Sequence, residues 1–417
     1  MENIAMISAM KTSMQYDVVI IGGGPAGASL AAALKGSGLS LALIEAGTYP
    51  HSNPPPAQEA SANGSLSKAS IDDDWDSRIY AISPGSSRFL NQIGAWSKLD
   101  PRRIAPIEQM RVFGDTGAKL EFTAYQMGVA ELACILENRA LQRALWQTLQ
   151  DQDDLDLLNP ARCAALSFTT DAAELTLEDG RRLSAKLIVG ADGRDSWVRN
   201  QAGISAAPVD YQQLGVVANF SCAVPHRGIA HQWFAEDGIL ALLPLPGQRV
   251  SMVWSVSPEK SKSLLALSDE ELCEQVSCAA RHTLGKLEVI TPAAAFPLRM
   301  LTLPQISAER VALIGDAAHN MHPLAGQGVN TGFRDARQLA QLLNSRGACA
   351  DCGDAQLLRR YDRKRREDIY TMQATTYGLK NLFCNDNPVL RSLRNMGLNV
   401  TNHLVPLKKL LMQHALN

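Results

Sequence analysis

The chain has 417 residues, of which 46% are hydrophobic and 20% charged, and its formal net charge is −2. This length predicts two or three domains, and the composition is that of a soluble globular protein. No window of 18 or more apolar residues is present, so the sequence predicts no transmembrane span. The first 15 residues lack the apolar region and cleavage site of a signal peptide, which favours a cytoplasmic protein.

The eight cysteines lack the spacing of a disulfide framework. The sole C-x-x-C, from Cys349 to Cys352, lies in a polar turn with no second pair of ligands nearby. We therefore expect reduced thiols and no metal site.

The first motif is a glycine-rich turn near the N-terminus. A short apolar run at 16–21 predicts a strand, residues 22–27 read GGGPAG, and residues 28–35 predict an Ala- and Leu-rich helix. In a strand-GxGxxG-helix unit, Gly22 permits the tight turn, Gly24 lets a pyrophosphate approach the backbone, and Gly27 allows close packing of helix on strand. The unit predicts dinucleotide binding, with Pro25 and Ala26 inside the turn.

A second predicted strand, at 39–44, ends at Glu45. This carboxylate stands about 20 residues past the glycines, where such folds place an acid that contacts a ribose. The fingerprint does not separate FAD from NAD.

Residues 50–74 are rich in Pro, Ser, Ala and Asn and predict a mobile surface loop. Order resumes at about Trp75, and residues 137–149 predict an amphipathic helix. Residues 187–199 predict a buried strand, a turn at Asp192-Gly193, and a helix. Asp-Gly is common in turns that begin helices, so a purely structural role of this pair remains the alternative to a binding role.

Between about 211 and 296 the pattern changes to strand-like runs at 215–220, 238–245 and 249–256, separated by turns. This predicts an antiparallel sheet with one apolar face, covering one side of a site.

The most informative stretch begins with an aliphatic strand at 310–315, which delivers Asp316 to a strand end. There a carboxylate can accept hydrogen bonds from vicinal hydroxyls of a cofactor chain. The later Gly326-Gln327-Gly328 lets backbone N–H groups approach a flat ring, and a helix from about Val329 aims its positive end there. The stretch predicts the floor of a flavin site.

The string HPLAGQGVNTGFRD at 322–335 resembles the signature of the ubiquinone-biosynthesis hydroxylases, group A flavoprotein monooxygenases related to para-hydroxybenzoate hydroxylase. Three motifs, GGGPAG, GADG and GDAAH, stand in the family's order, and the resemblance runs from about Tyr16 to the end of the chain. The C-terminal runs at 361–368, 372–375, 378–379, 382–383 and 393–398 look like the quinone-pathway enzymes and not like the small-phenol hydroxylases.

This resemblance implies an α/β fold with a discontinuous Rossmann-like FAD-binding domain, an inserted antiparallel β-sheet substrate domain and a C-terminal helical region. The expected FAD-binding segments are 14–84, 131–205 and 298–348; the expected substrate-domain segments are 85–130 and 206–297; and the helical region is 354–417.

The implied activity is FAD-dependent hydroxylation of a polyprenylated phenol through reduced flavin, O2 and a C4a-hydroperoxide, with NAD(P)H or a separate reductase as electron donor. Such chemistry needs water to be excluded from the site. The alternatives are a soluble hydroxylase of small phenols, a flavin-dependent polyprenyl reductase, or a non-catalytic flavoprotein subunit. We expect no nucleic-acid partner, and the sequence leaves open whether the chain forms homo-oligomers.

By resemblance, Asp192 and Gly193 serve the flavin and the pyridine nucleotide, and Arg78 contacts the cofactor, with a solvated surface residue as the alternative for Arg78. Arg139 is a further candidate, because the first turn of the helix at 137–149 places it toward the expected flavin tail. The expected cofactor-binding residues are Gly22, Gly24, Pro25, Ala26, Gly27, Glu45, Arg78, Arg139, Asp192, Gly193, Gly315, Asp316, Pro323, Gly326, Gly328, Val329 and Asn330. The candidates for the reaction centre are His322, Pro323, Gly326 and Gln327, and His319 is a further titratable group. The substrate-pocket candidates are His231, Trp233, Phe234, Leu240 and Leu242, for each of which core packing is the alternative.

From 354 to 417 there are eleven Lys or Arg and five Asp or Glu, a charge of +6 in a chain of −2. This asymmetry favours an anionic membrane surface or partners from the ubiquinone pathway. Pro406 predicts the start of a short helix with Leu407, Leu410, Leu411 and His414 at helical spacing. The alternative is that these leucines pack on the FAD domain and that the basic run is a solvated helix face.

Overall fold

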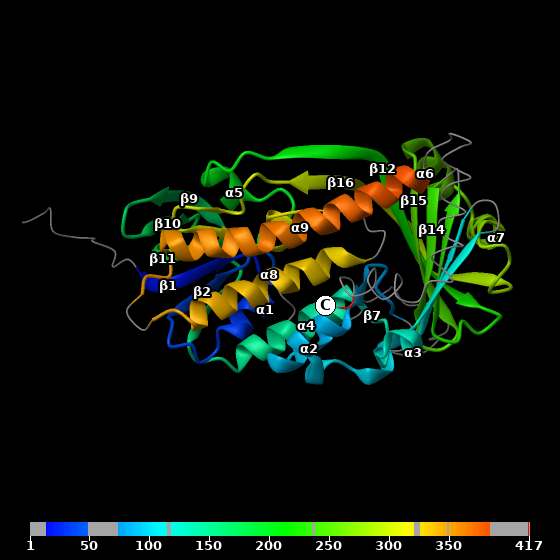
Figure 1. The fold of residues 1–417 in the computed structure, drawn as a ribbon, viewed down its shortest axis with the longest axis horizontal. Helices are drawn as coiled ribbons and strands as arrows, with labels where there is room; N and C mark the ends of the chain where they lie inside the picture. Colours follow the sequence, from blue (N-terminus) through cyan, green and yellow to red (C-terminus); the bar gives the residue numbers. More distant parts are fainter. Residues whose placement is uncertain are drawn as a thin grey trace, which may run out of the picture.

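The computed structural model describes residues 14–48, 74–114, 118–235, 238–320, 326–347, 350–383 and 416. These residues form three sheets of eight, seven and three strands, with helices packed around them. The eight- and seven-stranded sheets lie at opposite ends of an elongated molecule, and α9 (Ala355–Phe383) runs along its length between them (Figure 1).

The eight-stranded sheet is assembled from three separate parts of the chain. Its order is β17-β18-β11-β1-β2-β8, with β10 and β9 continuing from β11, and the pairs among β18, β11, β1, β2 and β8 are parallel. Parallel strands end at one edge, where ligands bind in open α/β sheets. The bounds are β1 (Met14–Ile21), β2 (Leu41–Ile44), β8 (Leu155–Leu158), β9 (Cys163–Phe168), β10 (Ala173–Leu177), β11 (Arg182–Gly190), β17 (Ser307–Ala308) and β18 (Val311–Leu313).

Helices α1 (Pro25–Ala33), α4 (Asn138–Gln150) and α8 (Gln327–Asn344) pack together and share the main hydrophobic core with this sheet. The buried face of α4 carries the apolar residues that the sequence periodicity predicted, such as Leu141, Leu145 and Leu149. Helix α2 (Pro84–Gln92) joins the same core, since Phe89 lies 6.2 Å from Phe333 between ring centres.

The seven-stranded sheet has the order β16-β12-β15-β14-β13-β5-β6 and is antiparallel except between β13 and β5. Helices α6 (Pro258–Leu265) and α7 (Asp269–Ala279) cover its outer face. The bounds are β5 (Gln109–Phe113), β6 (Lys119–Thr123), β12 (Ala207–Cys222), β13 (Ile229–Ala235), β14 (Gly238–Leu245), β15 (Arg249–Val256) and β16 (Leu287–Thr302).

A three-stranded sheet of β3 (Ile79–Ile82), β7 (Ala133–Glu137) and β4 (Ala105–Ile107) shares an apolar cluster with the inner face of the seven-stranded sheet. It therefore lies between the two larger parts. Short elements complete the described fold: α3 (Ala124–Met127), α5 (Trp197–Gln201), and the 3-10 turns η2 (Trp96–Lys98), η3 (Pro101–Arg103) and η4 (Gly315–Ala317).

Two predicted boundaries differ from the structure. Residues 85–99 were assigned to the substrate domain, but Phe89, Leu90, Ala95 and Leu99 are buried in the core of the eight-stranded sheet. The chain therefore enters the seven-stranded sheet only at β5. The predicted boundary at 297–298 falls inside β16, a 16-residue strand.

Several predictions concern residues outside the described ranges, namely His322, Pro323, Cys349, nearly all of the 50–74 loop and the helix after Pro406. Cys352 and five other described cysteines are free thiols. Within the described ranges, no cluster of His, Cys, Asp or Glu is suited to hold a metal ion, and no helix is long and apolar enough to cross a membrane.

Candidate functional site

The glycine turn after β1 lies at the carboxyl edge of the eight-stranded sheet. Gly22 has a φ of +109°, and a Cβ there would stand 2.3 Å from the Ala191 carbonyl oxygen, so no other residue fits. A Cβ on Gly27 would lie 2.0 Å from the Gly22 carbonyl oxygen. A Cβ on Gly24 would meet no protein atom within 4 Å. Two glycines thus serve packing, and the middle one faces open space.

Glu45, at the end of β2, lies against this turn. One carboxylate oxygen accepts a hydrogen bond from the Gly23 N–H at 2.7 Å, and the other accepts one from the Gly47 N–H at 2.8 Å. The indole of Trp146, on α4, donates to the Gly23 carbonyl at 2.9 Å. The turn is therefore held from β2 and α4, which places the Glu45 carboxylate beside the glycines.

Asp316 lies in η4, just beyond β18, and packs close to the start of α1. A Cβ on Gly315 would approach the Ala26 Cβ to 2.9 Å. The Asp316 side chain is exposed, and no hydrogen bond or ion pair of its carboxylate occurs within the described ranges. Its negative charge adds to burial in raising the pKa of Tyr80 to about 12, so β3 also runs close by.

Helix α8 begins two residues earlier than predicted, with Gly326 as its N-cap at a φ of +60°. Among the described residues, no side chain caps this end and no atom lies within 4 Å of a Cβ placed on Gly328. The helix dipole favours negative charge at this end.

Asn330 is completely buried and ties this helix end to β3. Its amide nitrogen donates to the carbonyls of Ala81 at 2.8 Å and Gly326 at 3.1 Å, and its side-chain oxygen accepts from the Ser83 N–H at 3.0 Å. The side chain is thus fully engaged in the protein, so any contact of Asn330 with a cofactor would come from its backbone.

Asp192 follows β11 and directs its carboxylate into its own chain. One oxygen accepts from the Ser196 hydroxyl at 2.6 Å and the other from the Val198 N–H at 3.0 Å, which caps α5. The Asp192 side chain therefore has the structural role that the sequence left as the alternative, in the turn that begins α5. The Asp192 N–H still borders the glycine turn, since a Cβ on Gly22 would lie 2.7 Å from it, and space beside Gly193 is open.

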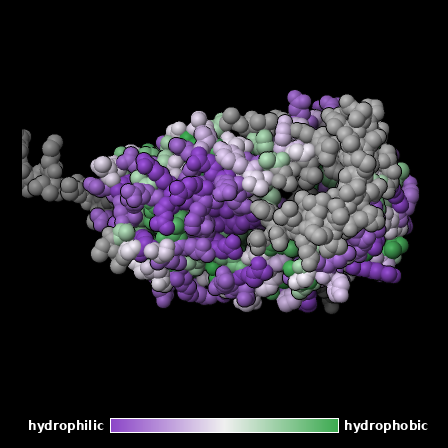
Figure 2. All heavy atoms as spheres, viewed as in Figure 1, coloured by the Kyte–Doolittle hydropathy of each residue, from purple (hydrophilic) through white to green (hydrophobic). Residues whose placement is uncertain are grey.

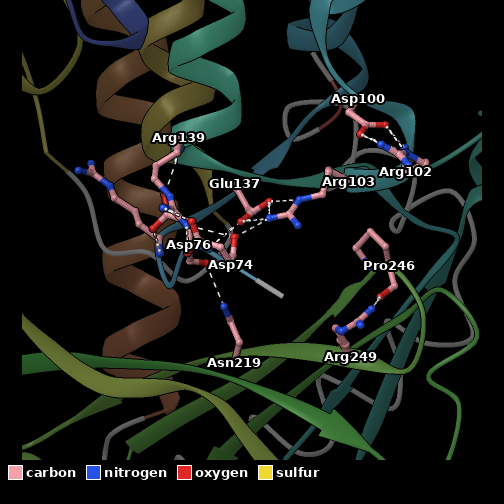
Figure 3. A network of polar contacts seen from close by, with 11 residues as sticks. Asp74, Asp76, Asp100, Arg102, Arg103, Glu137, Arg139, Asn219, Pro246 and Arg249 are labelled. Carbon is pink, nitrogen blue, oxygen red and sulfur yellow. Dashed lines mark hydrogen bonds and ion pairs between the residues drawn. The ribbon is translucent and has the colours of Figure 1, made fainter. Parts of the chain in front are cut away.

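Arg139 belongs to a polar network that joins the parts of the molecule (Figure 3). Its guanidinium makes two hydrogen bonds of 3.0 Å with Asp74 and is half exposed. Asp76 accepts from the Arg139 N–H at 3.0 Å and, through its carbonyl, from Asn219 of β12 at 3.0 Å. Arg78 lies over the Tyr80 ring at 5.5 Å. Both arginines thus lie beside the strand that reaches α8, and Asn219 binds the seven-stranded sheet to the same segment.

A salt bridge anchors this network. Glu137, at the end of β7, is 2% exposed and accepts from Arg103 Nε at 2.7 Å and Nη2 at 2.8 Å. The Arg103 guanidinium also stacks on the Trp75 ring, 3.9 Å from its centre.

The faces of the seven-stranded sheet correct the predicted substrate pocket. Trp233, Leu240 and Leu242 pack on the outer face with Leu272 and Val276 of α7. His231 stacks on Trp233 at 5.5 Å and pairs with Leu242, so it belongs to the same outer face. Of the five residues, only Phe234 lies in the inner apolar cluster, with Ile239, Leu245, Trp75 and Ile135. The sequence pattern predicted the antiparallel sheet but not which of its faces turns toward the cofactor.

A cavity of about 480 Å³ opens beside α5 and is lined by Arg194, Arg199, Arg299, Asn200, Leu301 and Asn320, among others. Arg199 is 6% exposed and donates to the carbonyls of Ala317 at 3.0 Å and Arg194 at 3.1 Å. It forms no ion pair with any described residue, its Nε has no hydrogen-bond partner there, and Asp195 also lines the cavity.

Sequence reasoning missed the residues that hold the predicted ones in place. His319 is 1% exposed, and its Nε2 lies 2.6 Å from Asp335 Oδ2, so it is a buried, hydrogen-bonded residue of the turn. Asp335 lies at the end of the FRD run, a visible signal, but its partner Arg365 stands 30 residues later on another helix.

These observations fit a bound FAD. Two helices, α1 and α8, begin at glycines without a side-chain cap, and each has a glycine that faces open space. Beside them stands an exposed carboxylate with no described partner. Such a set offers N–H donors and a dipole to phosphate and ring, and an acceptor to hydroxyls.

Comparisons with known proteins agree with this fit. The family model of an FAD binding domain matches residues 71–375, and a pyridine nucleotide-disulphide oxidoreductase model matches residues 16–96. The ubiquinone hydroxylase UbiL of Rhodospirillum rubrum is 35% identical over 96% of this chain and 89% of its own length. The 3-demethoxyubiquinol 3-hydroxylase of Escherichia coli is 33% identical over 97% of this chain and 99% of its own length.

Among solved structures, PqsL of P. aeruginosa in complex with 2-aminobenzoylacetate superposes with a TM-score of 0.74 at 24% identity, covering 92% of this chain and 99% of its own. That likeness confirms the predicted fold class. The sequence relatives confirm the predicted family, FAD as the cofactor, and monooxygenase chemistry. The chain belongs to the ubiquinone-biosynthesis hydroxylases, a family of FAD-dependent monooxygenases.

Proposed function

We propose that this enzyme hydroxylates the aromatic ring of a polyprenylated phenol in ubiquinone biosynthesis. The observation that carries the proposal is the apolar inner face of the seven-stranded sheet, where Phe234, Ile239 and Leu245 pack toward the cofactor half of the molecule. Such a wall suits a ring that bears a hydrocarbon tail and keeps water from the site. The relatives named for ubiquinone and demethoxyubiquinol hydroxylation support the same substrate class.

The residues of the glycine turn at 22–27, of the Gly315–His319 turn and of the start of α8 would hold the cofactor. When bound, FAD supplies the reduced flavin that activates O2 for ring hydroxylation. Asp316 would accept hydrogen bonds from hydroxyls of the cofactor chain, and the N–H groups around Gly24 would receive its pyrophosphate. Backbone N–H groups at the start of α8, such as that of Gly328, would stabilise negative charge on the ring, as donors of an oxyanion hole do.

The proposal is tested by supplying ¹⁸O2 to the FAD-loaded enzyme with a polyprenylated phenol and, separately, with the same phenol lacking its tail. We expect one labelled oxygen in the product and a strong preference for the tailed substrate. Equal turnover of both phenols would favour the small-phenol hydroxylase, and a reduced product without label would favour the polyprenyl reductase.

For the electron donor, we propose that NAD(P)H binds through its phosphates in the cavity beside α5. Arg194 and Arg299 line the cavity beside the buried Arg199 and offer the guanidinium donors that phosphates favour. Arg299→Ala should raise the KM for NAD(P)H at least tenfold, because the cavity would lose an exposed cation that can bind phosphate. Arg182→Ala, at the far end of β11, is the matched control. An unchanged KM in Arg299→Ala would favour a separate reductase.

We also propose that the C-terminal region docks the enzyme on an anionic membrane surface. Arg359, Arg360, Arg363 and Lys364 of α9 are exposed, and the face that α9 crosses is mainly hydrophilic (Figure 2). Arg365, by contrast, is 5% exposed, so the basic run is not entirely a solvated face. Flotation with anionic liposomes should show binding that a version ending at residue 399 loses. Equal binding by both versions, or none by either, would exclude the removed segment as a direct anchor.

A further inference from the structure

A cluster of buried charges joins α9 to the turn that carries Asp316. Asp335, on α8, is completely buried. Its Oδ1 accepts from Arg365 Nε at 2.7 Å, and its Oδ2 accepts from the Gly315 N–H at 2.9 Å and lies 2.6 Å from His319 Nε2. One carboxylate therefore fixes both ends of the Gly315–His319 turn and connects it to the middle of a distant helix.

The same cluster extends to the start of α8. Arg365 Nη1 donates to Asp368 at 2.7 Å, and Asp368 also accepts from Arg334 Nη1 at 3.1 Å. Arg334 Nη2 in turn donates to the side-chain oxygen of Gln327 at 3.2 Å. Gln327 is the first residue of α8 and stands between Gly326 and Gly328. Through this chain of contacts, α9 reaches both turns of the proposed flavin site.

The charged groups of this cluster compensate one another, because the buried guanidinium of Arg365 pairs with the carboxylates of Asp335 and Asp368. Burial raises the pKa of the Asp335 carboxyl, but nearby His319 and Arg365 outweigh that effect and hold the pKa below its usual range. Arg365 is buried and depends on the two carboxylates for compensation. Loss of either partner would leave an uncompensated charge in a medium of low polarity, where its field is weakly screened.

We infer that Arg365 and Asp335 are positioning residues for the flavin: they fix its two binding turns relative to each other and set the electrostatic potential there. The inference rests on the proposed assignment of these turns to the flavin. It adds a role for α9, whose contact with the turns passes through Asp335 and Arg334.

The test uses two charge-removing variants, Arg365→Met and Asp335→Asn, with two readouts on the FAD-loaded protein. Both variants should bind FAD at least tenfold more weakly. The flavin midpoint potential should fall in Arg365→Met, because an unbalanced carboxylate opposes added electrons, and should rise in Asp335→Asn, because an unbalanced guanidinium attracts them. A purely structural role would move both potentials in the same direction or neither.

Arg366→Met is the matched control. Arg366, the next residue on α9, makes an ion pair of 2.8 Å with Asp362, which accepts from the Ile306 N–H and touches neither flavin turn. Its loss should leave FAD affinity within twofold and the potential unchanged. Potentials that shift equally in all three variants would overturn the inference.

Arg365→Lys covers the case in which Arg365→Met does not fold. It keeps the charge and loses the forked geometry, so FAD affinity should fall while the potential stays at the wild-type value. Wild-type affinity in Arg365→Lys would overturn the positioning role. Asp316→Ala distinguishes failure of this inference from failure of the proposed function. If Asp316→Ala binds FAD normally, the assignment of these turns to the flavin is wrong. If Asp316→Ala binds FAD weakly while the Arg365 and Asp335 variants bind it normally, only the role of α9 is rejected.

Discussion

Two groups of helices in this enzyme differ in how their N-termini are closed. Helices α2, α6 and α7 each begin at a serine whose side chain accepts a hydrogen bond from the first turn, and α7 has a complete capping box at Ser268. Helices α1 and α8 begin at Gly24 and Gly326 with no side-chain cap. In the first group a side chain of the helix start accepts from a first-turn N–H, whereas in the second group no described side chain does so.

The difference separates stability from function within one type of element. A serine cap typically stabilises a protein by about 1 kcal/mol. Helices α1 and α8 lack that stabilisation. They begin near Glu45 and Asp316, whose carboxylates we propose as acceptors for hydroxyls of the cofactor. We therefore interpret the uncapped ends as the cofactor cradle.

The largest effect should come from filling the open space at the start of α8. Gly328→Val should abolish hydroxylation while the fold remains intact, because the added side chain would meet only the space reserved for the flavin. Gly378→Val is the matched control, since that glycine also lies in a helix and a Cβ there would meet no described atom within 4 Å. Activity assays and circular dichroism check both; normal turnover by Gly328→Val would mean that the glycine serves only the helix entry.

Removal of the free carboxylate should weaken the cradle more selectively. Asp316→Ala should lower FAD affinity by roughly 10- to 150-fold, the equivalent of charge-assisted hydrogen bonds of ~1.5–3 kcal/mol. Titration of the FAD-free protein measures this, with the exposed Asp153→Ala as control. A fully loaded, yellow Asp316→Ala protein would contradict the assignment.

His231 tests whether a buried polar group in this enzyme needs to serve the cofactor. It packs beside the Phe113 and Trp233 rings on the outer face, and burial with the charge of Arg111 lowers its pKa from 6.5 to about 4. The unfolded state therefore takes up its proton first, so stability is complete above pH 6.5 and falls toward pH 4.

His231→Phe should remove that loss, which amounts to about 3 kcal/mol for a shift of this size. Denaturant unfolding of both proteins between pH 7 and pH 4.5 measures it, and FAD affinity at pH 7 should not change. If the unfolding free energies of the two proteins depend on pH in the same way, the structural role of His231 is wrong. If His231→Phe binds FAD more weakly, His231 contributes to the cofactor site.

The smallest effect is expected at the closed helix ends. Ser268→Ala should cost about 1 kcal/mol of unfolding free energy, because the first turn of α7 loses its capping box. FAD affinity and turnover should stay at the wild-type level, since α7 covers the outer face of the sheet. Altered FAD binding in Ser268→Ala would contradict the claim that the serine-capped helix starts do not contribute to the cofactor site.

The sequence predicted the cradle well because its signals are local. Parallel strands end at one edge, so a glycine turn after β1 and an aspartate after β18 were expected to meet, and in the structure Gly315 lies against Ala26. The substrate face was predicted less well. A period of two groups His231 with Trp233 but does not reveal which face turns inward, and here those rings pack on the outside.

Long-range partners were beyond reach for a different reason. The buried contact between Asp335 and Arg365 depends on the packing of α9 against α8, and no spacing within either helix encodes it. Arg365 belongs to a run of basic residues whose other members are exposed or partly exposed. Only the packing of the two helices distinguishes the positioning residue from its solvated neighbours.

The most direct test of the uncapped helix ends is amide hydrogen exchange in the FAD-free and FAD-loaded enzyme. Open N–H groups exchange quickly until a ligand accepts their hydrogen bonds. FAD should therefore slow exchange in peptides covering 22–28 and 326–332 and leave the capped starts at 257–261 and 268–272 unchanged. Unchanged exchange at both glycine-capped ends in the fully loaded protein would contradict the account.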